Sequence, residues 1–324
     1  MSHRRTLQLV LIVTSVVLLL LLPKIFPTIY INLFIEIFIF ALFAVSFNLL
    51  FGYCGLLPFG HAAFFGVGAY TAGIIFNRLH GIPLPMTLLM AALSGFLTGI
   101  FIGIFCVRLR GAYFALISLA FQMFLFTLAW KWRAVTKGDD GMGIFRPELH
   151  LPILGNISMM EISNLYYFTL VVVALGISTC YLFLKTPLGN SALCMRENDF
   201  RASFLGYNIF LTKLIIFSVS ALLASLAGAL FVLFEEFVVT SSIDINMSMT
   251  VLVMSIIGGT SNFFGPILGA TFYIVFQNWI SGITHQWWLI MGILFIAVIL
   301  YLEGGLISLF QMERFRFWVG RRVK

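Results

Sequence analysis

The chain has 324 residues, of which 61% are hydrophobic and only 10% are charged, and its mean hydropathy is +1.07. This composition excludes a soluble globular domain, because such domains carry about 25% charged residues. The net charge of +7 does not indicate a nucleic-acid partner, since Lys and Arg lie in short loops and at the two ends. The four cysteines form no C-x-x-C pair, so the sequence predicts neither a metal site nor a disulfide framework.

Apolar stretches follow one another along the whole chain. At about 20 residues for each membrane span, they lie near 7–22, 30–51, 58–76, 85–107, 112–130, 164–184, 213–233, 247–258, 266–281 and 288–304. Arg4 and Arg5 precede the first stretch, and no small-residue cleavage site follows it, so we expect an uncleaved span. The predicted fold class is all-α: a polytopic integral membrane protein with about 8–10 transmembrane helices, two of them short or broken.

Basic residues predict the orientation of these spans. With a cytoplasmic N-terminus, nearly every cytoplasmic segment is basic, as the positive-inside rule requires. These segments contain Arg4, Arg5, Arg108, Arg110, Lys185, Arg196, Arg201, Lys213, Arg314, Arg316, Arg321, Arg322 and Lys324. Both termini are thus predicted to be cytoplasmic, with a basic tail over 305–324. The loops 131–164 and 234–247 are predicted to lie outside.

Glycines, a proline and a histidine interrupt the apolar stretch from Gly52 to Gly73, GYCGLLPFGHAAFFGVGAYTAG. A second break, IGGTSNFFGPILGA at 257–270, has similar spacing of aromatic residues and glycines. Irregular backbone at membrane depth persists only where protein or water covers it, and transporters place such segments at their substrate sites. We therefore predict that the two breaks line the path of a solute.

Within the breaks, three kinds of residue are candidates for this path. Glycines either adopt backbone angles that other residues avoid or permit contacts too close for a side chain. Aromatic side chains would form apolar walls and a gate, and the histidine would steady the loop rather than act as a base. The candidates are Phe59, Gly60, His61, Phe65, Gly66, Tyr70, Gly259 and Gly265.

The alternative for the small residues is that they only allow helices to approach one another closely. Two further stripes have this helical spacing. They are Ala62, Gly66, Ala69 and Gly73, and Ala221, Ser225 and Gly228.

The longest polar stretch between spans, 185–212, opens with Thr-Pro and contains an Arg-Glu-Asn-Asp cluster. It predicts a short amphipathic cytoplasmic helix that could dock into the groove of a partner.

Several blocks together resemble one known family. They are NLLFGYCGLLPFGHAAFFGVGAY (48–70), RLRGAYFALISLAF (108–121), KGDDGMG (137–143), MRENDFRASFLG (195–206) with KLIIFSVSALLASLAGAL (213–230), and IIGGTSNFFGPILGA (256–270). In this order they resemble the LivM-type permease of branched-chain amino acid ABC transporters. The chain departs from the family pattern at Pro58, where Ser is usual, at Gln122, near which an acidic residue is usual, and at Thr136-Lys137-Gly138 in place of Thr-Gly-Gly.

The resemblance implies a single transmembrane permease domain over 1–324 in the inner membrane of a bacterium. It also implies partners: a second homologous permease (LivH-like), two cytoplasmic ATP-binding subunits, and a periplasmic or lipid-anchored substrate-binding protein. The chain itself would bind no cofactor and catalyse no reaction, and it has no G-x-x-x-x-G-K-[ST] phosphate loop. The residues that would meet the ATPase, in the loop over about 185–212, are Arg196, Glu197, Asn198, Ala202 and Gly206.

Other functions are kept as alternatives. A membrane enzyme would need a constellation such as paired Asp or Ser with His, whereas only His61 and Glu36 lie well within the predicted spans. An ion-coupled secondary transporter would need buried carboxylates, of which Glu36 is the one candidate. Within the importer class, a path with few fixed charges suits a branched-chain or related small amino acid. Because related permeases carry urea, short amides, sugars or nucleosides, these substrates stay open as well.

Overall fold

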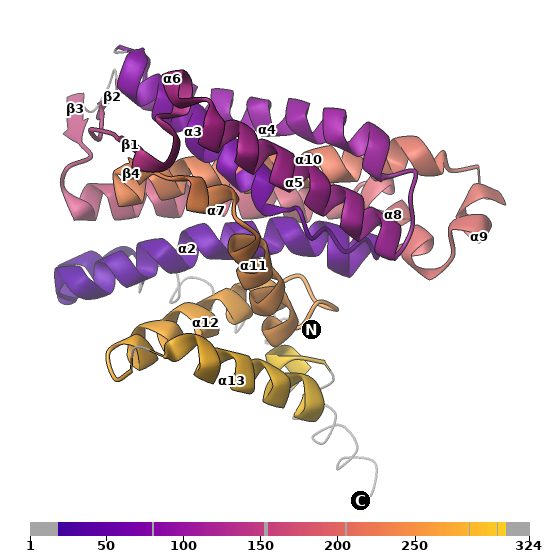
Figure 1. The fold of residues 1–324 in the computed structure, drawn as a ribbon. Coiled ribbons are helices and arrows are strands. Elements are labelled where there is room, and N and C mark those ends of the chain that lie inside the picture. Colours follow the sequence, from indigo (N-terminus) through magenta and orange to yellow (C-terminus); the bar gives the residue numbers. More distant parts are fainter. Residues whose placement is uncertain are drawn as a thin grey trace, which may run out of the picture.

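The computed structural model describes residues 19–79, 81–151, 155–204, 206–284, 286–302 and 304–308 (Figure 1). The predicted first span near 7–22 and the predicted basic tail lie mostly outside these residues. Nearly all regular structure in the described part is helical, which confirms the predicted all-α class.

Five helices in the described part are long and apolar enough to cross a membrane. They are α2 (Thr28–Asn48) with its π-helical continuation η1 (Leu49–Tyr53), α4 (Leu84–Cys106), α5 (Ala112–Lys131), α7 (Ile162–Lys185) and α10 (Ile209–Glu235). The shortest has 20 residues, which at about 1.5 Å per residue match a hydrocarbon core of about 30 Å. The chain is therefore a multi-pass membrane protein.

Four further apolar helices have only 14 to 17 residues: α3 (Ala62–Arg78), α11 (Ile245–Gly258), α12 (Gly265–Ser281) and α13 (Trp287–Tyr301). The sequence predicted two short or broken crossings, and the described part of the chain has four short helices, two of which are bounded by helix breakers as follows. Helix α3 begins only after Pro58 and Gly60. Helix α11 ends at Gly259, whose φ of 102° lies in a region that residues with a Cβ rarely adopt.

Local sequence also sets the ends of the long helices. Helix α4 begins after Pro83 and has Pro85 in its first turn, where the missing N–H costs no helical hydrogen bond. At the start of α10 the Asn208 side chain accepts a hydrogen bond from the Leu211 N–H (3.1 Å). The same helix ends where Glu236 turns left-handed, with a φ of 59°.

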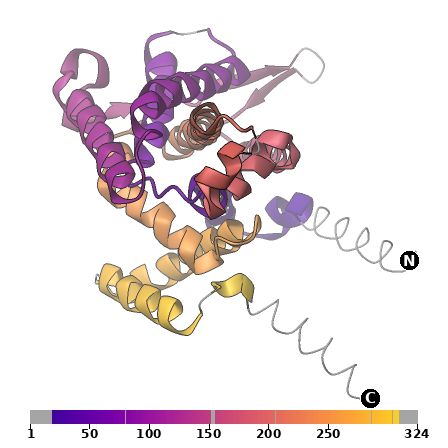
Figure 2. The same cartoon turned by 90° about the vertical axis from the view of Figure 1, so that its right-hand side faces the viewer.

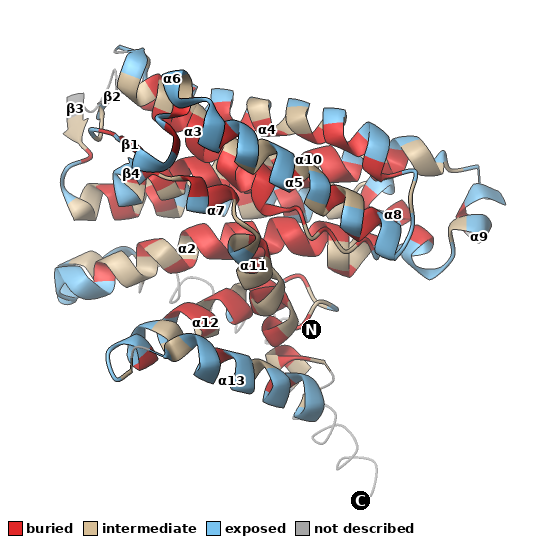
Figure 3. Cartoon of the chain, in the orientation of Figure 1, coloured by how far each residue is buried: buried red, intermediate tan, exposed pale blue. Residues whose placement is uncertain are grey.

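The core of the molecule is built around α2 and α10, which are the most buried long helices in Figure 3. In the most apolar 18-residue stretch of each helix, 78% of the residues are buried in α2 and 72% in α10, against 28% in α5 and 22% in α7. Since a helix surrounded by protein is buried on all sides, α2 and α10 are central, whereas α5 and α7 expose apolar side chains on the outside of the bundle.

Small residues bring α3 and α4 into backbone contact with α10. A Cβ at Gly68 would overlap the Ser225 carbonyl, and one at Gly228 would overlap the Phe65 carbonyl. On α4, a Cβ at Gly95 would overlap the Ser225 side chain. The packing role expected of the second small-residue stripe is confirmed at Ser225 and Gly228.

The two ends of the bundle differ. One end carries α6 (Arg133–Thr136), η2 (Gly138–Asp140), η3 (Thr240–Ile243), and two small antiparallel pairs, β1 (Met142–Gly143) with β4 (Phe237–Val238) and β2 (Glu148–Leu151) with β3 (Gly155–Ser158). We call it the hairpin end. Because Met142 pairs with Val238, the two loops that were predicted to lie outside meet at this end.

Arg146 joins these two loops further. Its Nε donates to the Leu233 carbonyl (2.8 Å) and its Nη2 to the Phe234 carbonyl (2.7 Å), and it forms an ion pair with Glu236 (3.1 Å). A cation at the C-terminus of α10 satisfies carbonyls that have no partner within the helix.

The opposite end carries α8 (Pro187–Glu197) and α9 (Asp199–Phe204), and Figure 2 views the molecule from this side. The turn between α4 and α5 lies there too, since Arg110 forms an ion pair with Asp199 (3.3 Å). Within the described residues, the segments around Arg110 and 185–212 that were predicted to be cytoplasmic therefore lie at one end, and the two loops predicted to be outside lie at the other.

Candidate translocation site and coupling segment

The first break begins where α2 changes to the π-helical turn η1 and then leaves the helix. Residues 55–58 form no regular structure, and α3 starts again at Ala62. A π-helical turn is rare and is frequently found at functional sites. The predicted interruption is therefore present, at the junction of two helices in the core.

His61 lies at the centre of this break and is fully buried. Its Nε2 is 2.9 Å from Ser46 Oγ, and Ser46 Oγ donates its own hydrogen to the Phe43 carbonyl (2.6 Å). The His61 ring is stacked on Phe43, with centroids 5.4 Å apart. This fixed position is what a residue that steadies the loop requires.

Three side chains hold the start of α3, and the sequence analysis did not assign them. Ser118 Oγ accepts from the Gly60 N–H (3.3 Å), and Ser248 Oγ accepts from the Ala62 N–H (2.9 Å). Gln122 in turn accepts from Ser248 Oγ (3.0 Å) and donates through Nε2 to the Ile243 carbonyl (2.6 Å). These contacts fasten the break to α5, η3 and α11.

Gln122, near which the family usually has an acidic residue, is the centre of this network. Both ends of the Gln122 amide are used, one as donor and one as acceptor, and the residue is fully buried. An ionised carboxylate could not donate to the Ile243 carbonyl.

The aromatic path candidates differ in exposure. Phe65 is fully buried and lies 4.6 Å from Phe43, measured between ring centroids, whereas Phe59 is half-buried. Tyr70 is 6% exposed, and its hydroxyl has no hydrogen-bond partner among the described residues. In this conformation Phe65 and Tyr70 are packed inside the protein, and Phe59 is partly exposed.

The glycine candidates lie at close contacts. A Cβ at Gly60 would overlap the Ser118 carbonyl, one at Gly66 would overlap Ile243, and one at Gly265 would overlap the Gly259 carbonyl. The close packing of this conformation is thus enough to explain why these positions are glycine. A role for these glycines in the path stays a prediction.

The two breaks meet at Gly52. A Cβ there would lie 2.5 Å from the carbonyl oxygen of Thr260, in the turn between α11 and α12. The structure therefore brings the two glycine-rich segments together, although they lie about 200 residues apart in sequence.

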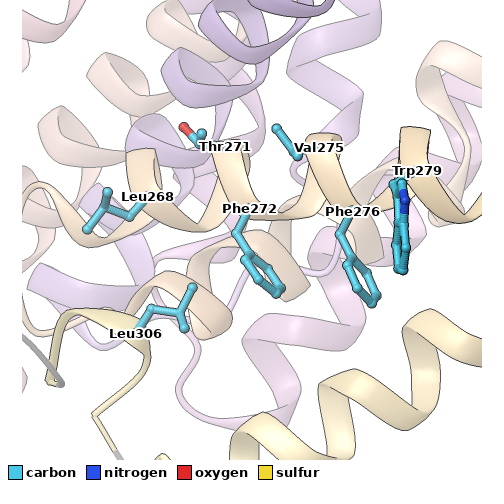
Figure 4. A pocket seen from close by; sticks show the side chains of 7 residues that line it. All are labelled: Leu268, Thr271, Phe272, Val275, Phe276, Trp279 and Leu306. Carbon is cyan, nitrogen blue, oxygen red and sulfur yellow. The ribbon is translucent and has the colours of Figure 1, made fainter.

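A cavity of about 440 Å³ lies elsewhere, along α12 (Figure 4). It is lined by Leu268, Thr271, Phe272, Val275, Phe276, Trp279 and Leu306. The lining is apolar apart from Thr271 and contains none of the path candidates. Such a cavity offers no group that would fix the charges of an amino acid.

The polar stretch 185–212 folds as predicted into short helices. The Thr186 side chain caps α8 by accepting from the Gly189 N–H (3.3 Å). At the other end of the segment, Gly206 has a φ of 85°, and a Cβ there would meet no atom within 4 Å. A residue with a side chain at 206 would fit in space but would strain the backbone.

An ion cluster anchors α9. Asp199 Oδ2 accepts from Lys213 Nζ (2.7 Å) and pairs with Arg110 Nε (3.3 Å), and the Asp199 and Lys213 side chains are only 10% and 5% exposed. Ala202 is buried on the same helix. The family resemblance implied that Ala202 meets the ATPase, whereas in this conformation its side chain is buried against the permease.

Other residues of this segment remain on the surface. Glu197 is exposed, and Phe200 and Phe204 are 68% and 77% exposed, with their rings edge-to-face at 4.8 Å. Arg196 is exposed as well, but its guanidinium reaches inward and donates to the carbonyl of Gly52. The described residues contain no group of three or more His, Cys, Asp or Glu side chains that could hold a metal ion.

Comparison with known proteins gives the same class. The family model for the permease component of branched-chain amino acid transport systems matches residues 29–299. The high-affinity branched-chain amino acid transport system permease protein LivM of Escherichia coli is 26% identical over 297 residues, covering 83% of this chain and 68% of the relative. LivM of Salmonella typhimurium matches with the same identity and coverage.

A more distant relative is the autoinducer 2 import system permease protein LsrC of Escherichia coli, 23% identical over 247 residues and covering 73% of this chain and 68% of the relative. No solved structure matches the chain. The family match extends over most of the chain and includes both breaks and the segment that forms α8 and α9. The chain belongs to the family of permease components of branched-chain amino acid transport systems.

Proposed function

We propose that this chain is the permease subunit of an ABC importer that moves branched-chain amino acids across the inner membrane of a bacterium. Membership of the permease family carries the proposal, and the LivM relatives favour this substrate class. The whole chain would form one transmembrane permease domain. It would itself bind no cofactor and catalyse no reaction, because ATP would be hydrolysed by other subunits.

The proposed partners are a second homologous permease, two cytoplasmic ATP-binding subunits and a substrate-binding protein. In this arrangement the α8–α9 end faces the cytoplasm, together with both termini, and the hairpin end faces the binding protein. The basic residues at the α8–α9 end support this orientation through the positive-inside rule.

The ATP-binding subunit would meet the exposed residues of α8 and α9. Glu197 offers a charge, and Phe200 and Phe204 offer an aromatic surface at the end of the bundle, where Figure 1 places α9. The Asp199 ion cluster and buried Ala202 would hold this surface rigidly against α10.

A photo-crosslinking residue at position 204 tests this docking in the assembled complex. We expect a covalent adduct with the ATP-binding subunit. The same residue at position 145, where Phe145 is 87% exposed near the hairpin end, is the control and should give none. Adducts only with lipid at position 204 would contradict the docking.

A second candidate function is import of autoinducer 2, because one relative is a permease of that system. Urea and sugars are further alternatives, since a path of glycine backbone and aromatic rings would also admit them. Uptake of labelled leucine, urea, ribose and autoinducer 2 should be compared in cells that express the complete operon. Leucine uptake that depends on this chain is the expected result, and uptake of only one of the other solutes would reassign the substrate.

A further inference from the structure

Three segments that are far apart in sequence meet at one residue of the first break. Gly52 lies within the π-helical turn η1, where a Cβ would overlap the Asn48 side chain and lie 2.5 Å from the Thr260 carbonyl of the second break. The carbonyl of the same Gly52 accepts a hydrogen bond from Arg196 of α8. Helix α8 and both breaks are therefore joined through Gly52.

The chemistry of a helix end explains the contact with Arg196. The chain leaves the helix just after η1, so the last carbonyls of η1 have no partner within it. A cation near the C-terminus of a helix is favourable, because the helix dipole places partial negative charge there. Arg196 supplies that cation from another helix, and its guanidinium satisfies the Gly52 carbonyl.

A second contact fixes the Arg196 side chain along its length. Gly55 has a φ of 69°, and the position of a Cβ there lies 3.1 Å from Arg196 Cγ. The neighbouring residues of α8 that face the core, Ala192 and Met195, are buried. A displacement of α8 would therefore move the backbone of residues 52–55 with it.

We infer that Arg196 is a positioning residue that transmits the motion of α8 to both breaks, and that it does not itself contact the ATP-binding subunit. This inference rests on the proposed function and refines it, because it separates the residue that moves the path from residues that dock the ATPase. Docking is left to Glu197, Phe200 and Phe204. Arg196 instead links docking to the path.

The test compares Arg196→Gln, Arg196→Lys and the control Arg108→Gln in the reconstituted complete complex. Arg108 is a second arginine at the same end, placed over the Phe210 ring at 5.3 Å, so its replacement removes the same charge without touching the break. Three quantities are measured: the amount of ATP-binding subunit that copurifies, the rate of ATP hydrolysis, and solute uptake.

For Arg196→Gln we expect normal copurification and continued ATP hydrolysis, but uptake reduced about tenfold, the effect of losing one hydrogen bond to a charged group. Arg196→Lys keeps the cation and should recover part of the uptake, and Arg108→Gln should transport normally. Loss of copurification in Arg196→Gln, or unchanged uptake, would overturn the inference. Absence of ATP-driven uptake in the wild-type complex would instead contradict the proposed function.

A disulfide gives a second test, in which Gly55→Cys alone is the control for the backbone strain that a side chain causes at a φ of 69°. The Cβ position of residue 55 lies 3.7 Å from Arg196 Cβ, within the range of about 3.5–4.5 Å that disulfides require. With the native cysteines replaced, Gly55→Cys with Arg196→Cys should transport poorly when reduced and recover uptake when oxidised, because a covalent bond then replaces the hydrogen bond. Equal uptake in the two states would contradict the proposed link.

Discussion

Replacing Gln122 with methionine should loosen the start of α3 while leaving the shape of the side chain almost unchanged. Gln122→Met removes the donor to the Ile243 carbonyl and the acceptor of the Ser248 hydroxyl, both in a fully buried site. Ser248 in turn holds the Ala62 N–H, the first residue of α3. The substitution therefore affects a chain of three hydrogen bonds and not one.

The expected cost follows from two estimates. Hydrogen bonds between membrane helices are worth on average about 0.6 kcal/mol, so two of them give roughly 1 kcal/mol. A buried carbonyl left without a partner costs about 1–3 kcal/mol, which sets the upper part of the range. We expect the free energy of unfolding to fall by roughly 1–3 kcal/mol, and the melting temperature in detergent to fall by a few degrees.

Gln277→Met is the matched control. Gln277 is half-buried on α12, and no hydrogen bond of its side chain is described, so the same change should stay within about 0.5 kcal/mol of wild type. Thermal unfolding of both purified variants, followed in one detergent, checks the difference. Equal melting temperatures for Gln122→Met, Gln277→Met and wild type would refute the assignment of the network.

Three further predictions concern topology, coupling and the path. A cysteine at Ser241 should react with a membrane-impermeant thiol reagent from outside, and one at Ser203 only after the membrane is opened, since both residues are exposed. The reverse labelling would require the spans to be redrawn. Charge reversal at Glu197 should abolish uptake and copurification of the ATP-binding subunit but leave the melting temperature unchanged, whereas normal uptake would contradict the docking surface. Gly66→Ala should lower both melting temperature and uptake, because a Cβ there overlaps Ile243; a loss of uptake, or a changed solute preference, at unchanged melting temperature would show that this position serves the path directly.

The sequence alone predicts the class of fold and the places where it is interrupted. Glycine, proline and histidine within apolar stretches stand out against lipid-facing sequence, so the breaks near His61 and Gly259 could be found without coordinates. The positive charges likewise predict which segments lie at the same end of the bundle, and the ion pair of Arg110 with Asp199 agrees with that prediction.

The partners of the breaks could not be found in this way. Serine is common in membrane helices, and nothing near Ser118 or Ser248 in sequence indicates that each accepts a hydrogen bond from the first break, 58 and 186 residues away. The burial of Ala202 and the inward course of Arg196 likewise depend on how α8 and α9 pack. Residue type predicted that this segment is a polar helix, but only packing decides which side chains face outward.

The hydrogen bond from Ala62 to Ser248 also sets an order for the assembly of the chain in the membrane. At about 5–20 residues per second, the ribosome adds the 186 residues that separate these partners in roughly 10–40 s. The contacts of Gly68 with Ser225 and of Gly228 with Phe65, which join α3 to α10, become possible only shortly before that. During this interval α3 is too short to cross the bilayer and has none of these partners. The backbone N–H groups of the first turn of α3 then need other hydrogen-bond acceptors, such as water, lipid headgroups or the insertion machinery.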